Sequence, residues 1–427
     1  MRDAFLPADI LLPTRSVDMS RWSVIACDQY TSEPDYWEKV RDITGSGPSA
    51  LPMIYPEVYL EDGDMEDRLA GIQDAMEEYM SQGVFRQYKD AMIYVRRIDS
   101  SGNLRQGLVG KIDLECYEYE KGSQSMVRAT EETVPGRLPP RVRIRENANL
   151  ELPHVIMLID DMENTVIEPL ADNLDDMEMV YDFDLMLGGG HLTGYLVNEE
   201  QQERIISCLR KLDDPECYNN RYDLHDEKPM IYAVGDGNHS LASAKAYYEK
   251  LKREHEGEDL SDHPARYALV ELVNLHSPSL VFEPIYRIVT RVDPRHMMEK
   301  MIEEMDLHQE GQGQSFEMVF ADPSGQGIRR KVFVIGKPVS ELAVGSLQSF
   351  LDAYTGRYGG KIDYIHGEDT VLSLSRREGA VGFLLPTMHK SELFPAVMAD
   401  GALPRKTFSM GHARDKRYYT ECRKIQK

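Results

Sequence analysis

The sequence predicts an α/β protein, with an α+β mixed sheet as the alternative. Strand-like and helix-like stretches alternate along its 427 residues, and such alternation is typical of this class. Hydrophobic residues make up 41% and charged residues 29% of the chain, a composition that provides enough apolar material for a folded core. The sequence contains no internal repeat and no heptad pattern, so we expect a globular protein rather than a solenoid or coiled coil.

The first half of the chain contains one clear helix and several strands. Asp64–Gln82 is predicted to be an amphipathic helix, because Leu69, Ile72 and Met76 recur at helical spacing and acidic residues occupy its first turn. Short apolar runs predict strands at Arg21–Cys27, Ala91–Ile98, Leu108–Tyr119 and His154–Asp161. The last run is dense enough in apolar residues to be a buried strand.

The second half begins with a strand that runs directly into a helix. Met230–Gly237 is the strand, and the helix extends from His239 to about Glu254. Later elements are predicted from the same kinds of pattern. They are strands at Ala268–Leu275 and Pro284–Val292, a helix with Asp293 as N-cap and Pro294 as first residue that runs through Met305, the strand KVFVIG, a helix near Glu341–Tyr354, the strand KIDYIHG, a helix near Glu368–Arg377 and the strand AVGFLLP.

A segment rich in glycine and proline at 309–327 predicts where the chain divides. On this prediction, residues 1–308 form the main α/β domain. Residues 328–427 form a smaller α/β part, which packs against the first or stands alone.

The formal net charge of −24 excludes some classes of partner. A surface this acidic repels nucleic-acid backbones and anionic lipid head groups, so any phosphate site must be local. The five dispersed cysteines show no metal-ligand spacing and indicate a reducing compartment. The sequence has no signal-peptide pattern and no apolar run of the roughly 20 residues that cross a membrane. We therefore expect a cytoplasmic protein that binds a small molecule, and neither nucleic acid nor membrane.

The turn between the central strand and its helix is the best candidate for a functional site. Gly235, Asp236 and Gly237 provide a tight turn, and Asn238 has the residue type of an N-cap. The first helix amides have no intrahelical acceptors and, with the helix dipole, favour an anion. We predict that Gly235, Gly237, Asn238 and Ser240 bind phosphate or a nucleotide. Asp236, as a base or metal ligand, and His239, as a proton donor, are the predicted catalytic residues. The same residues also suit a turn that only caps a helix.

An arginine-rich segment precedes this turn in an otherwise acidic chain. Arginine binds phosphate or carboxylate with two parallel hydrogen bonds, so the segment is a candidate anion site. If the segment is extended, alternate residues share one face. The predicted phosphate ligands are Arg128, Arg141, Arg143 and Arg145. The alternative is a solvated network in which these arginines pair with nearby glutamates, among them Glu131, Glu146 and Glu151.

Other candidates follow predicted strands. Asp160 and Asp161 end a buried strand and are weak candidates for Mg²⁺ ligands, although such residues also begin turns. Asp28, Glu131 and His366 are predicted to line a pocket. Cys27 is expected to be buried and inert. The basic and aromatic KTFSMGHARDKRYY is expected to be a packed tail or a pocket wall.

Several stretches, in this order, resemble the family of uncharacterised proteins named domain of unknown function 1015. They are VRATEETV, RVRIRENANLELPHVIMLIDD, MIYAVGDGNHSLASAKAYYE, LVELVNLHSPSLVFEPIYRIV, IDYIHGED and AVGFLLPTMHKSELFPAVMADGALPRKTFSMG. The central motif of that family usually reads Asp-Gly-His-His-Arg before a helix. Asp236, Gly237 and His239 match it, whereas Asn238 replaces the first histidine and Ser240 replaces the arginine. The family also usually has histidine where Tyr286 stands.

That motif is similar to one in the ParB/sulfiredoxin-like superfamily, which includes free-serine kinases and in which the turn holds nucleotide phosphates. The resemblance implies a ParB/sulfiredoxin-like core element embedded in a larger chain. It favours a nucleotide-dependent phosphotransferase that uses ATP or ADP with Mg²⁺ and acts on a small polar metabolite, with a serine-like amino acid among the candidates. Because the arginine of the motif is missing, the alternative is a non-catalytic protein that senses a nucleotide or phosphorylated metabolite.

Overall fold

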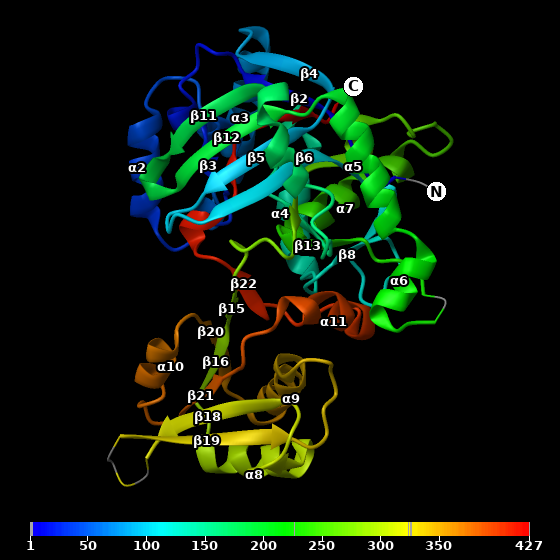
Figure 1. Ribbon diagram of the computed structural model, residues 1–427. Helices are drawn as coiled ribbons and strands as arrows, with labels where there is room; N and C mark the ends of the chain where they lie inside the picture. Colours follow the sequence, from blue (N-terminus) through cyan, green and yellow to red (C-terminus); the bar gives the residue numbers. More distant parts are fainter. Residues whose placement is uncertain (1–2, 226, 323, 325–326, 427) are drawn as a thin grey trace. The chain divides into compact units, whose positions relative to one another are not determined.

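The computed structural model describes residues 3–225, 227–322, 324 and 327–426. The chain divides into two compact units (Figure 1). Unit 1 comprises Met1–Val281 and Gly411–Lys427, and unit 2 comprises Phe282–Met410. The division therefore lies elsewhere than the sequence predicts, because residues 309–327, described except at 323, 325 and 326, fall inside unit 2. The polar, glycine-rich residues there flank a strand, Ser315–Ala321, and do not link two domains.

Unit 1 is built on a ten-stranded sheet in the order β11-β12-β5-β6-β14-β10-β13-β8-β7, with β1 paired to β6. Parallel and antiparallel pairs both occur, since β10 runs parallel to β14 but antiparallel to β13. The predicted α/β class is confirmed, and the sheet is mixed, as the alternative expected. The strands are β1 (Phe5–Leu6), β5 (Ile93–Ile98), β6 (Leu104–Asp113), β7 (Tyr117–Glu118), β8 (Val127–Ala129), β10 (Ile156–Ile159), β11 (Glu178–Leu185), β12 (Gly190–Leu196), β13 (Tyr232–Asp236) and β14 (Tyr267–Asn274).

The C-terminal segment, red in Figure 1, returns to unit 1 after the whole of unit 2. Two of its short strands pair with strands from the first part of the chain. The three two-stranded sheets of unit 1 join β2 (Ala8–Pro13) to β4 (Phe85–Ala91), β3 (Val24–Ile25) to β23 (Tyr418–Tyr419), and β9 (Leu150–Glu151) to β24 (Arg423–Lys424). The tail is therefore part of the core architecture of unit 1.

The helices of unit 1 confirm the clearest amphipathic predictions. Helix α3 begins after Asp64 and buries Leu69, Ile72 and Met76, as their spacing predicts. Helix α7 starts one residue before the predicted His239 and ends at Glu254. The α-helices are α1 (Met19–Trp22), α2 (Pro34–Thr44), α3 (Met65–Ser81), α4 (Leu138–Glu146), α5 (Glu199–Leu212), α6 (Pro215–Tyr222) and α7 (Asn238–Glu254).

Unit 2 contains a six-stranded sheet in the order β17-β19-β18-β21-β16-β20. The predicted helix at Glu368–Arg377 is shorter in the structure and ends at Leu374. The strands are β15 (Phe282–Pro284), β16 (Tyr286–Thr290), β17 (Leu307–His308), β18 (Ser315–Ala321), β19 (Ile328–Ile335), β20 (Lys361–Ile365), β21 (Ala380–Leu384) and β22 (Phe408–Met410). The α-helices are α8 (Pro294–Met305), α9 (Ala343–Tyr358), α10 (Glu368–Leu374) and α11 (Leu393–Asp400).

None of the helices in the described part of the chain is long and apolar enough to cross a membrane.

Candidate functional site

The site lies in unit 1, where β10 begins beside the end of its antiparallel neighbour β13. Ile156, the first residue of β10, pairs with Asp236, the last residue of β13. Residues just before β10 therefore lie beside the turn that leads into α7. On another side, β23 pairs with β3, which brings the residues after β3 beside the C-terminal segment. Strand pairing thus brings segments that are far apart in sequence to the same part of unit 1.

His154 is the centre of this arrangement and is only 5% exposed. Its Nδ1 lies 2.8 Å from the Tyr419 hydroxyl, and its Nε2 lies 3.1 Å from Ser240 Oγ and 3.6 Å from an Asp28 carboxylate oxygen. Burial alone would lower the pKa of His154, but the Asp28 carboxylate outweighs burial and the pKa is raised. Burial would raise the pKa of Asp28, but His154 holds it below its ordinary value. The two groups therefore favour an imidazolium–carboxylate pair.

Tyr419 links His154 to Cys27. The Cys27 amide donates to the Tyr419 hydroxyl oxygen at 3.2 Å, and that hydroxyl donates to Cys27 Sγ at 3.0 Å. Because the single hydroxyl proton points to sulfur, the oxygen accepts from a protonated Nδ1 of His154, which agrees with the imidazolium form. Burial raises the pKa of the Cys27 thiol strongly. The thiol therefore stays protonated, as expected for an inert cysteine, but Cys27 is only partly buried and not fully buried as predicted.

The turn into α7 has the glycine that the prediction requires but a different N-cap. Gly237 is the N-cap, with a φ of 82°, and a side chain there would meet Val155 at 3.1 Å. Asn238, predicted as the N-cap, is instead the first helical residue. Its side chain accepts from the Thr130 amide at 3.2 Å and donates to Thr130 Oγ1 at 3.3 Å. Asn238 thus ties the turn to the end of β8. The cap prediction was wrong because the helix begins one residue earlier than expected, after Gly237, whose positive φ glycine adopts readily.

The two predicted catalytic residues both lie at this turn. One carboxylate oxygen of Asp236 accepts from the Gly237 amide at 3.1 Å, and the other lies 3.2 Å from Lys416 Nζ. His239 Nε2 accepts from the Val134 amide at 3.3 Å, so this nitrogen carries no proton. Gly235 lies within β13. Asp236 therefore holds a lysine beside the turn, a role that the sequence did not suggest.

A cavity of about 160 Å³ opens beside this cluster, between α4, α7 and residues 53–60. His154, Ser240, Tyr419 and Cys27 line it, together with an ion pair between Arg141 and Glu57. Burial raises the pKa of Glu57 although Arg141 opposes this shift. The expected tail or pocket wall at KTFSMGHARDKRYY is confirmed, because Tyr419 belongs to that stretch.

The arginine segment is not extended, so the condition under which its arginines would share one face is not met. Arg141, Arg143 and Arg145 lie on helix α4, where alternate residues point to different sides. Arg141 and Arg145 line the cavity, whereas Arg143 forms an exposed ion pair with Glu66. Arg145 pairs with the buried carboxylate of Glu151 at 2.6 Å. The three arginines therefore do not share one face. Each pairs with a carboxylate, but the expected network of nearby glutamates is found only for Arg145 and Glu151, and that pair is largely buried; Arg141 and Arg143 pair with glutamates distant in sequence.

Arg128 is buried in β8 and donates to the Ser125 carbonyl at 2.9 Å. Glu131 is partly buried just after the same strand. His366 is exposed and follows β20 in unit 2, whereas the cluster around His154 belongs to unit 1. The predicted residues therefore do not all come together within one unit.

The predicted metal ligands have structural partners at the opposite end of β10 from His154. Asp160 bonds to His276 and Tyr222. Asp161 accepts from the Thr165 amide at 2.6 Å and from the next amide along the chain at 2.8 Å, as a turn-forming aspartate does. No group of three or more His, Cys, Asp or Glu side chains within the described ranges could hold a metal ion.

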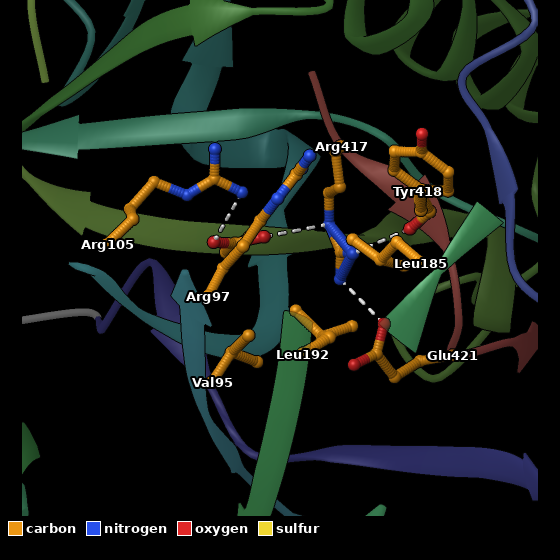
Figure 2. A pocket seen from close by; sticks show the side chains of 9 residues that line it. Val95, Arg97, Arg105, Leu185, Leu192, Arg417, Tyr418 and Glu421 are labelled. Atoms are coloured by element: carbon orange, nitrogen blue, oxygen red, sulfur yellow. Dashed lines mark hydrogen bonds and ion pairs between the residues drawn. The ribbon is translucent and has the colours of Figure 1, made fainter. Parts of the chain in front are cut away.

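A buried ionic network fixes the tail that carries Lys416 and Tyr419 (Figure 2). Arg417 lies 3.2 Å from Glu271 and 2.7 Å from Glu421. Arg97, 2% exposed, donates to the backbone carbonyl of Lys416 and to that of Arg414. Charged groups in such dry surroundings persist only when they are paired. The network therefore holds the backbone on both sides of the residues that reach the site.

Sequence reasoning missed His154 and Glu57, and it placed Lys416 and Tyr419 in a tail or pocket wall without giving either residue a role in the site. The most accessible signal was His154, which directly precedes a buried strand in the stretch ELPHVIMLIDD. The tail residues gave no local signal, because their place in the site depends on strand pairing across the length of the chain.

Comparison with protein families identifies the chain. The sequence profile described as "Protein of unknown function (DUF1015)" matches residues 11–354. The chain belongs to the DUF1015 family. The predicted family membership is thereby confirmed, and the match covers the strand–turn–helix element of this DUF1015 protein as well as His154 and Asp28.

Comparisons with individual proteins found only distant similarities. No curated protein matches this DUF1015 chain. Among solved structures, a free serine kinase in complex with AMP is similar, with 10% identity and a TM-score of 0.39, over 74% of this chain and 90% of the other. SbnI from Staphylococcus aureus has 12% identity and a TM-score of 0.36, over 71% and 83%. A conserved hypothetical protein from Pyrococcus furiosus has 10% identity and a TM-score of 0.35, over 73% and 93%.

Proposed function

We propose that this DUF1015 protein is a nucleotide-dependent phosphotransferase that acts on the hydroxyl group of a small metabolite. A serine-like amino acid is one candidate acceptor. One observation carries the proposal: the first turn of α7 meets the ion pair of the buried His154 with the partly buried Asp28 at the edge of a cavity. Phosphoryl transfer requires little more than a phosphate cradle, compensating positive charge and a carboxylate that takes a proton.

The first turn of α7 supports phosphate binding. Its amides lack intrahelical acceptors, and Gly237 at the cap position has no side chain that would compete for them. Lys416, held 3.2 Å from Asp236, adds a cation at the same turn. The side chain of Lys416 is 13% exposed, so water screens its charge less than at an open surface. A phosphate here is attracted locally although the protein as a whole is strongly acidic.

Asp28 and His154 supply the acid–base part of the proposed reaction. The acceptor oxygen forms a bond to the terminal phosphorus of the nucleotide, and the bond from that phosphorus to its bridging oxygen breaks. The leaving group is the nucleotide with one phosphate fewer. The hydroxyl proton passes to the Asp28 carboxylate, and the neighbouring His154 imidazolium offsets the charge that develops on the phosphoryl group.

The proposed cofactor is ATP or ADP with Mg²⁺. Mg²⁺ usually binds one or two carboxylates together with phosphate oxygens, and Asp28 and Asp236 are the carboxylates beside α7. When bound, the ion would neutralise phosphate charge. The Asp160–Asp161 pair is less suited, because it follows the end of β10 that lies away from Asp236 and the first turn of α7.

Calorimetric titration of the full chain with ATP, ADP and Mg²⁺ tests the binding step. We expect one nucleotide to bind, and we expect Asp28→Asn to retain this binding but to lose phosphoryl transfer to small alcohols and amino acids. Absence of binding by any nucleotide at millimolar concentration would reject the proposal.

A second candidate is a non-catalytic sensor of a nucleotide or phosphorylated metabolite. It is favoured by Ser240, which stands where the family motif has arginine and supplies no guanidinium to stabilise a phosphoryl group during transfer. A sensor would bind nucleotide without turnover, and Asp236→Asn would leave that binding unchanged. Turnover of bound nucleotide in the presence of an acceptor would exclude it.

A further inference from the structure

The residues that line the cavity beside His154 indicate the chemical class of the acceptor substrate. Its wall includes three groups that hydrogen-bond in one chain, Ser240, His154 and Tyr419. Most of the remaining wall is apolar and comes from several elements of unit 1. Examples are Met53, Ile54, Leu60, Met76, Ile144 and Leu241. A cavity that is apolar over most of its surface and has a few directed polar groups is the usual form of a small-molecule site.

We propose that this cavity holds the carbon skeleton of the phosphoryl acceptor, and that the acceptor is an uncharged ring or branched alcohol. This inference rests on the proposed phosphotransferase function and narrows its substrate class. The acceptor hydroxyl lies at the Ser240–His154 end, where its proton passes to Asp28 as its oxygen bonds to phosphorus. The rest of the molecule fills the apolar part of the cavity.

The position of the cavity assigns it to the acceptor and not to the nucleotide base. His154 and Ser240, which belong to the proposed reacting centre, are themselves part of its wall. In a nucleotide, the ribose and the inner phosphates separate the base from the phosphorus that is transferred. The occupant of a cavity that begins at the reacting centre is therefore the molecule that attacks the phosphorus. The volume of about 160 Å³ also lies below the roughly 300–1000 Å³ of sites that enclose larger ligands.

The charges in the wall argue against a serine-like acceptor. The free amino acid carries an ammonium and a carboxylate, and both would leave water on entering the cavity. The charged side chains that could receive them are already paired, Arg141 with Glu57 and Arg145 with Glu151. Burying an unpaired charge is strongly unfavourable, whereas apolar surface is stabilised when it is removed from water. The cavity therefore favours an acceptor whose only strongly polar group is its hydroxyl.

Ligand binding to the full chain tests this without requiring catalysis. Benzyl alcohol is the probe, L-serine and adenosine are the comparisons, and binding is measured by calorimetry. Ala244→Leu places a larger side chain on the cavity wall from α7, and Ala268→Val does so from β14. Ala70→Leu adds the same leucine to an exposed position of α3 and is the matched control. The thermal melting of each variant shows whether it is folded.

We expect benzyl alcohol to bind the wild-type and Ala70→Leu proteins, and to bind at least about tenfold more weakly to a folded cavity variant. Equal binding to Ala244→Leu, Ala268→Val and the wild type would place the probe elsewhere and overturn the proposal. Tight binding of L-serine in place of benzyl alcohol would overturn the substrate class. Adenosine that competes with benzyl alcohol and is lost in Ala244→Leu would assign the cavity to the nucleotide base. If benzyl alcohol binds as expected but no nucleotide binds, the proposed function fails while the apolar ligand site remains.

Discussion

The Asp28–His154 ion pair gives the most direct quantitative prediction. Coulomb's law over the 3.6 Å between His154 Nε2 and the Asp28 carboxylate oxygen gives about 1 kcal/mol in bulk water. At an effective dielectric constant of about 20 it gives about 5 kcal/mol. The Asp28 side chain is 28% exposed, so water screens part of the attraction. We therefore expect a coupling free energy of about 1–3 kcal/mol between the two residues in a double-mutant cycle.

The cycle consists of Asp28→Asn, His154→Gln and the double variant, each unfolded in urea. The chain has two tryptophans, and both Trp22 and Trp37 are buried in the core of unit 1. Their fluorescence therefore follows unit 1 separately from unit 2, which matters because multidomain chains often unfold in several steps. The exposed Arg143–Glu66 pair is the control, and its coupling should stay below about 1 kcal/mol.

The sign of the pH dependence follows from the two shifted pKa values. The pKa of His154 is raised in the folded protein, so its contribution is complete below the unfolded histidine pKa of about 6.5 and is lost at higher pH. The pKa of Asp28 is lowered, so its contribution is complete above about 3.9 and is lost in acid. The coupling should be largest near pH 5.5 and should shrink by about pH 9.5. A coupling below about 0.5 kcal/mol at pH 5.5, or one as large at pH 9.5, would refute this account.

Three further predictions concern the buried network, the turn and the lysine at the site. Glu271→Gln should destabilise unit 1 by about 3–5 kcal/mol, since it removes the buried carboxylate that pairs with both Arg105 and Arg417 and leaves Arg417 with Glu421 alone. The exposed Arg143→Gln should cost less than about 1 kcal/mol, and urea unfolding followed by tryptophan fluorescence compares the two variants. Gly237→Ala should lower the free energy of unfolding by about 1–3 kcal/mol, because φ is +82° and the new Cβ meets the residue before β10 at 3.1 Å. Gly136→Ala has open space around it and should be nearly neutral. Equal effects of the two variants in thermal unfolding would contradict the assigned turn. Lys416→Met should weaken nucleotide binding about tenfold to a hundredfold in calorimetry, and unchanged affinity would remove this lysine from the phosphate site.

Helices with regularly spaced apolar residues could be predicted from the sequence, whereas α4 could not be predicted in this way. Helices α3 and α7 bury one face, so hydrophobic side chains recur at helical spacing. Helix α4 has no buried residue, and its arginines alternate with apolar residues as in a strand. Its start nevertheless carries a helix signal, because prolines occupy the first turn. Turn chemistry was more informative here than hydrophobic periodicity.

Part of the candidate site consists of residues that are close together in the sequence, and part depends on contacts between residues that are far apart. The turn at Gly235–Ser240 could be identified because a buried strand, two glycines and a helix follow one another directly in the sequence. The contact between Tyr419 and His154 joins residues 265 positions apart and depends on the pairing of β23 with β3. Neither partner has a residue type or spacing that marks this contact. The acid–base half of the site therefore emerges only when the sheet is assembled.

Because the site needs residues from distant parts of the sequence, it limits which fragments of the chain can be tested for activity. The family profile ends at residue 354, and unit 1 is interrupted after Val281, so either point would be a natural place to truncate. Both truncations remove Lys416 and Tyr419, the cation at the turn and the hydrogen-bond partner of His154. They also remove Arg417 and thereby leave Glu271 buried without that partner. A fragment that ends before residue 411 would therefore lose both the site and part of the core of unit 1, and its inactivity would say nothing about the reaction of the full chain.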